Sequence, residues 1–124
     1  DDILNMLGGL DVGVHGRVAK YEFDDTFTEF GRTLDVQYGE HNYAVNNLRC
    51  RKYHDTLKII ESEKGSVDAV VGDIFSLDLA LPLAMGKHVI LKKNDYTPAW
   101  SLDYVSQHER GHVVEDISEV PSVL

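Results

Sequence analysis

Apolar positions in the second half of the chain alternate between short β-branched runs and segments with helical spacing. Residues 67–71, 88–91 and 112–114 form three such runs. Apart from Asp68 they are largely apolar on both faces, which is typical of parallel strands covered by helices on each side. The pattern therefore predicts three buried parallel strands.

Helical spacing fills the intervals between these runs. Residues 76–85 place apolar side chains on one face and end at a glycine, a common helix stop. Residues 55–64 also end at a glycine. Thr97 and Pro98 fit the start of a third helix, and Asp116 fits the cap of a final turn.

The first half of the chain is less regular. Residues 12–23 fit one strand or a hairpin. Residues 26–34 are predicted to form a short helix and residues 35–38 a strand, while residues 43–53 have a mixed pattern.

Strands that alternate with helices pair in parallel through crossover connections. We therefore expect an α/β fold, a three-layer αβα Rossmann-like sandwich with a mostly parallel sheet, in which residues 67–71 are the central strand. The length of 124 residues predicts one domain over 1–124. Because the chain does not begin with Met, this domain is expected to be a processed chain or a piece of a longer one.

Composition narrows the classes of function. Twelve basic and 21 acidic residues give a net charge of −9, which disfavours nucleic acid as a partner. The most apolar stretch is too short to span a bilayer, so we expect no membrane partner and a cytoplasmic protein. The single cysteine, Cys50, excludes an internal disulfide framework and is expected to be a buried apolar residue.

Two carboxylates stand where a parallel strand is expected to end. Asp73 follows the run at residues 67–71, and Asp78 lies five residues later. Ligands of open α/β sheets bind at the carboxyl ends of strands, and Mg²⁺ accepts a few carboxylates together with water and phosphate oxygens. The pattern thus indicates a Mg²⁺ site. Helix capping by Asp73 is an alternative explanation of the same spacing.

The segment GDIFSLD at residues 72–78, with the strand before it and Gly86 after the helix, resembles the fourth motif of the haloacid dehalogenase superfamily. The resemblance covers residues 52–124. It implies a phosphohydrolase that acts on a small phosphorylated molecule, with Asp73 and Asp78 holding Mg²⁺ and Lys52 steadying the nucleophile and the phosphate.

The catalytic motif of that superfamily also has a counterpart here. The segment EFDDT at residues 22–26 resembles it, with Glu22 at the position of the nucleophile. The resemblance implies that Asp24 is both the acid–base group and a further metal ligand.

Two other resemblances use the same part of the chain. The segment DLALPLAMGK at residues 78–87 is similar to a helix of nucleoside 2-deoxyribosyltransferases, which would make Asp78 the nucleophile. The segments GKHVI and GHVV, at residues 86–90 and 111–114, are similar to the C-terminal half of GT-B glycosyltransferases. A non-catalytic Rossmann-like binding module is the third class of function.

Residues 108–112 match the zinc motif HExxH. That motif requires one helix to carry both histidines toward the metal. Gly111 and the β-branched residues after it predict instead that the helix stops there and a strand begins.

Overall fold

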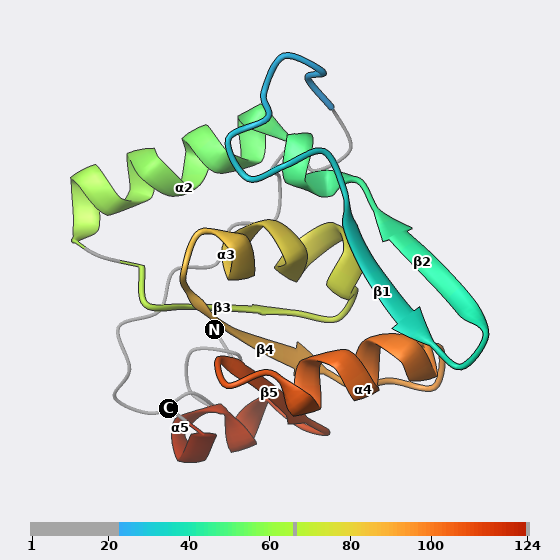
Figure 1. Cartoon of the computed structure of the whole chain (residues 1–124). Coiled ribbons are helices and arrows are strands. Elements are labelled where there is room, and N and C mark those ends of the chain that lie inside the picture. Colours follow the sequence, from blue (N-terminus) through green and yellow to red (C-terminus); the bar gives the residue numbers. More distant parts are fainter. Residues whose placement is uncertain (1–22, 66, 124) are drawn as a thin grey trace.

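The computed structural model describes residues 23–65 and 67–123 (Figure 1). The strand or hairpin predicted at residues 12–23 lies outside the described residues except for Phe23. Glu22 also lies outside them. The described residues form a mixed α/β structure with an antiparallel hairpin and a three-stranded parallel sheet. None of the helices among them is both long and apolar enough to cross a membrane.

The parallel sheet contains the three predicted runs. It has the order β3 (Ala69–Gly72), β4 (His88–Lys92), β5 (Gly111–Val114), so β4 lies in the middle. The expectation that residues 67–71 form the central strand is wrong for the described sheet. The physical reason is burial: the three consecutive apolar residues Val89, Ile90 and Leu91 are fully buried, whereas Val71 in β3 is 37% exposed.

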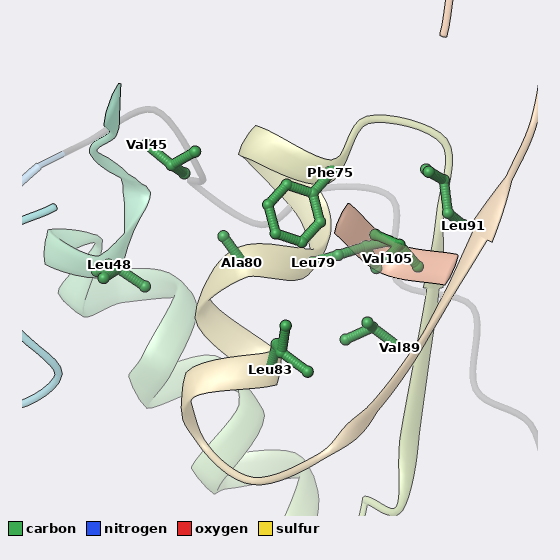
Figure 2. Close-up of a cluster of buried hydrophobic side chains, with 9 residues drawn as sticks. All are labelled: Val45, Leu48, Phe75, Leu79, Ala80, Leu83, Val89, Leu91 and Val105. Atoms are coloured by element: carbon green, nitrogen blue, oxygen red, sulfur yellow. The ribbon is translucent and has the colours of Figure 1, made fainter. Parts of the chain in front are cut away.

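The two faces of the sheet are covered by different elements. Val89 and Leu91 pack with α3 (Ala80–Ala84) and α4 (Ala99–Gln107) in the largest buried cluster, drawn in Figure 2. Ile90 points to the opposite face because side chains alternate along a strand. There it packs with Val120 of the short helix α5 (Val120–Val123).

The helix expected at residues 76–85 is divided into two parts. A π-helical turn, η2 (Phe75–Leu79), comes first and α3 follows. Proline explains part of the change. Pro82 has no backbone N–H, so it cannot donate to the carbonyl of Asp78 four residues earlier. The Tyr53 hydroxyl donates to that carbonyl instead, at 2.5 Å.

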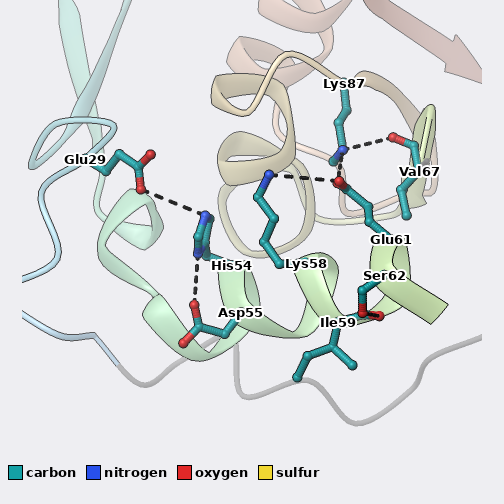
Figure 3. Close-up of polar contacts among 9 residues, drawn as sticks. All are labelled: Glu29, His54, Asp55, Lys58, Ile59, Glu61, Ser62, Val67 and Lys87. Atoms are coloured by element: carbon teal, nitrogen blue, oxygen red, sulfur yellow. Dashed lines mark hydrogen bonds and ion pairs between the residues drawn. The ribbon is translucent and has the colours of Figure 1, made fainter. Parts of the chain in front are cut away.

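Helix α2 (Arg51–Lys64) begins four residues before the expected start and packs beside α3 (Figure 1). Lys87 joins it to the sheet. The Lys87 ammonium donates to the Glu61 carboxylate at 2.5 Å and to the Val67 carbonyl at 2.9 Å (Figure 3). Because Lys87 is nearly buried and Glu61 partly so, the pair fixes α2 against the start of β3.

The strand predicted at residues 35–38 forms, and it is the first strand of a hairpin. The hairpin consists of β1 (Leu34–Tyr38) and β2 (His41–Val45), and Gly39 supplies the positive φ of 60° that its two-residue turn requires. A short 3₁₀ turn, η1 (Asn47–Arg49), leads from β2 into α2. The hairpin packs on α4, where the Tyr43 and Trp100 rings stack at 4.8 Å.

The helix predicted at residues 26–34 does not form, since that segment consists of turns. The predicted last turn is confirmed. Asp116 accepts from the backbone N–H of Ser118 and forms a capping box with Glu119 at η3 (Ile117–Glu119).

Candidate functional site at the carboxyl edge of the sheet

The carboxyl ends of the three parallel strands lie at one edge of the sheet. Asp73 follows β3, Lys93 follows β4 and Glu115 follows β5. Crevices at this edge are where open α/β sheets bind ligands. The sheet therefore brings acidic and basic side chains to the edge at which a ligand is expected.

Asp73 is exposed and makes no hydrogen bond or ion pair within residues 23–65 and 67–123. It does not cap the following turn: the cap position of η2 belongs to Ile74, whose own side chain makes no capping hydrogen bond. The capping explanation of Asp73 is therefore wrong. Its carboxylate stands at the end of a parallel strand without a structural role in the described part of the chain.

Asp78 has a structural role at the same turn. Its Oδ2 accepts from the backbone N–H of Ile74 at 3.0 Å, which holds the carboxylate beside the end of β3. Gly72 makes this contact possible. A Cβ at position 72 would lie 2.5 Å from Asp78 Cβ and 2.8 Å from Asp78 Oδ2, far inside van der Waals contact. The glycine at position 72 thus has a steric reason: it leaves space for the Asp78 side chain.

Tyr53 connects this turn to α2. Its hydroxyl, which donates to the Asp78 carbonyl, belongs to a side chain that is only 3% exposed. Burial raises the pKa of the Tyr53 hydroxyl well above its ordinary value, and the nearby Asp78 adds to the increase. Tyr53 consequently remains a neutral hydrogen-bond donor.

A groove of about 430 Å³ lies at the ends of β4 and β5, on the same edge of the sheet. Its lining residues are Lys92, Lys93, Asn94, Asp95 and Glu115. Gly72, the last residue of β3, pairs with Leu91, the residue before Lys92, so β3 ends close to the lining of the groove.

The charges of the groove are only loosely paired. The Lys93 ammonium lies 3.9 Å from the Glu115 carboxylate, and the Lys92 ammonium donates to the Lys93 carbonyl at 3.2 Å. Both lysines can therefore turn toward an anion at little cost. Sequence reasoning did not single out these residues, although they directly follow a predicted parallel strand, which is the signal that drew attention to Asp73.

Asp24 and Lys52 lie near the start of α2. Asp24 accepts from the backbone and the hydroxyl of Thr26 and pairs with Arg51 at 2.9 Å. The hydrogen bonds from Thr26 lower the pKa of Asp24, and Arg51 contributes further. Lys52 lies in the first turn of α2, where its side chain is exposed.

The predicted metal ligands do not form one cluster. Within residues 23–65 and 67–123, no three His, Cys, Asp or Glu side chains are placed to hold a metal ion together. Asp24 therefore does not join Asp73 and Asp78 in a three-ligand site. Those two carboxylates flank the same short turn and are the pair on which a cation site depends.

The groups invoked by the deoxyribosyltransferase resemblance are engaged elsewhere. Asp78 bonds to Ile74, and Lys87 pairs with Glu61. The HExxH segment does not lie on one helix. Helix α4 ends at Gln107, His108 follows it, and His112 belongs to β5.

Comparisons of the chain with protein-family models, with curated proteins and with solved structures found no match.

Proposed function

We propose that the chain is a Mg²⁺-dependent phosphohydrolase of the haloacid dehalogenase type, acting on a small phosphorylated molecule at the carboxyl edge of a Rossmann-like αβα sheet. The observation that carries the proposal is the state of Asp73. An exposed carboxylate without a partner among the described residues follows a parallel strand, at the same sheet edge as a groove that contains two lysines.

The residues at this turn fit Mg²⁺ by their chemistry. Mg²⁺ is usually held by one or two carboxylates and keeps several waters or phosphate oxygens as its remaining ligands. Asp73 would supply one ligand, and Asp78, the second carboxylate of the same turn, would supply another. When bound, the ion would neutralise phosphate charge and polarise a phosphoryl oxygen.

The groove supplies the second half of the proposed site. Lys92 and Lys93 would bind the phosphorylated part of the substrate as point charges, and Asn94 would border it. The Asn94 side chain accepts from the Tyr96 backbone N–H at 2.8 Å, which keeps this loop in place. Glu22 as nucleophile and Asp24 as acid–base group remain predictions.

Hydrolysis of p-nitrophenyl phosphate tests the proposal. We expect Mg²⁺-dependent release of nitrophenol, loss of it in Asp73→Asn, and a raised KM in Lys93→Gln. Asp35→Asn is the matched control, because Asp35 is exposed on the hairpin and has no partner in the described part of the chain. Absence of turnover in the wild type, or full turnover in Asp73→Asn, contradicts the proposal. Binding of a phosphate analogue without turnover favours the non-catalytic binding module.

A further inference from the structure

Two histidine rings face each other at the opposite, amino-terminal edge of the sheet. His88 is the first residue of β4, and His112 lies in β5. His112 pairs with Ile90, which is two residues after His88, so alternation along the strands places both rings on the same face. The parallel ladder thus fixes the relative position of the two rings.

The two rings are close enough to form a hydrogen bond. His88 Nδ1 lies 3.2 Å from His112 Nε2, and the ring centroids are 5.4 Å apart. At that centroid spacing the two nitrogens lie between the rings and point toward each other. One ring therefore donates an N–H to the lone pair of the other, which requires that at least one of the two rings is neutral.

The same distance suits a metal ion. Two imidazole nitrogens that bind one tetrahedral Zn²⁺ at the usual bond length are about 3.3 Å apart. The observed separation of 3.2 Å requires only that the rings tilt so that both lone pairs meet at one point. His88 is exposed and His112 is partly exposed, so an ion can reach them from solvent.

We propose that His88 and His112 form a two-histidine site for a borderline divalent cation, represented by Zn²⁺, with water as the remaining ligands. Imidazole selects zinc and its neighbours in the transition series, whereas Mg²⁺ prefers oxygen. Burial and the nearby His88 lower the pKa of His112, which favours the neutral ring that a metal needs. The site is at the other end of the strands from Asp73 and does not depend on the proposed phosphohydrolase.

The structure also separates this site from the HExxH motif. His108 accepts from the Arg110 backbone N–H through Nδ1 at 3.0 Å and lies 6.2 Å from the Tyr104 ring. The partner of His112 is thus His88 from the neighbouring strand rather than His108 from the same sequence motif. The choice of partner distinguishes the two zinc hypotheses experimentally.

Zn²⁺ titration of the full chain, carrying no histidine tag, tests the proposal by calorimetry and by ¹⁵N NMR of the imidazole rings. We expect saturation at one equivalent, with shifts at His88 Nδ1 and His112 Nε2. His88→Gln should weaken Zn²⁺ binding by at least about tenfold, since even changes around a ligand cost that much. Because His88 is exposed, this variant should fold normally.

His108→Gln and His41→Gln are the matched controls and should leave Zn²⁺ affinity unchanged. His41 is an exposed histidine on the hairpin. The proposal is overturned if the wild type shows no saturable Zn²⁺ binding, or if His108→Gln abolishes binding while His88→Gln preserves it. Equal affinity for Mg²⁺ would also overturn it.

Discussion

The close approach of Gly72 and Asp78 makes a quantitative prediction about stability. In Gly72→Ala, the new Cβ would lie 2.5 Å from Asp78 Cβ, about 1 Å inside the optimal separation of two carbon atoms. Overpacking of this kind costs about 1–3 kcal/mol. A displaced Asp78 also loses its bond to Ile74, worth about 1 kcal/mol more. We expect Gly72→Ala to lower the free energy of unfolding by about 2–4 kcal/mol.

A double-mutant cycle isolates the contact. Asp78→Gly removes the Cβ and the carboxylate that the new methyl group would strike, so Gly72→Ala should cost much less in that background. We expect a coupling free energy of at least about 1 kcal/mol. Urea denaturation followed by circular dichroism measures all four proteins, provided that they unfold in one step with similar slopes.

Gly111→Ala is the control for this cycle. Its Cβ would lie 2.1 Å from the Val105 carbonyl oxygen, so it is strained by a different neighbour, two strands away from β3. The losses of unfolding free energy caused by Gly111→Ala and by Asp78→Gly should therefore be additive. If the losses of unfolding free energy caused by Gly72→Ala and by Asp78→Gly are also additive, within about 0.5 kcal/mol, the steric explanation of Gly72 is refuted.

Two further predictions concern polar groups. Tyr53→Phe should lower the free energy of unfolding by about 1 kcal/mol, because the Asp78 carbonyl loses its hydrogen-bond donor. An absorbance titration of the wild type should find one tyrosine that does not ionise in the ordinary pH range. Normal ionisation of all tyrosines would refute this. Hydrogen bonds from Ser118 lower the pKa of Asp116, so its contribution to stability is complete above the ordinary carboxyl pKa and is lost as the pH falls through the lowered value. Asp116→Asn should therefore reduce the loss of stability in acid, as measured by urea denaturation from pH 7 to pH 2, and an unchanged pH profile would argue against this role.

Much of the second half could be predicted because local and tertiary preferences agree there. The three apolar runs became β3, β4 and β5 as expected, although only β4 is largely buried. Gly86 has the positive φ of 88° that ends a helix. The capping box at Asp116 depends on neighbours in sequence. Such features involve only a few neighbouring residues, so they can be predicted from the sequence without knowledge of the fold.

Other features depend on contacts between distant segments. Phe27 and Phe30 have helical spacing, but both rings pack against His54 of α2 while their own segment consists of turns. The π-helical turn arises where Pro82 and Tyr53 act on the same carbonyl, and Tyr53 is 25 residues away from Asp78.

In the candidate site, too, some features follow from neighbouring residues in the sequence and others depend on the fold. Asp73 could be found because it directly follows a strand, whereas its freedom from structural contacts within residues 23–65 and 67–123 is visible only in the fold. The partner of His112 could not be predicted either, because the strand register brings it to His88, 24 residues earlier in the chain.

The most direct test of the proposed site is Mg²⁺ titration of the wild type and of Asp73→Asn, with a phosphate analogue present. Backbone amide NMR should show saturable shifts around Gly72, Asp73 and Asp78 in the wild type. These shifts should be weak in Asp73→Asn and unchanged in the control Asp35→Asn. Since Asp73 has no structural partner among the described residues, the variant should be as stable as the wild type. A wild type without saturable shifts at this turn, or an Asp73→Asn variant that binds Mg²⁺ equally well, would contradict the account.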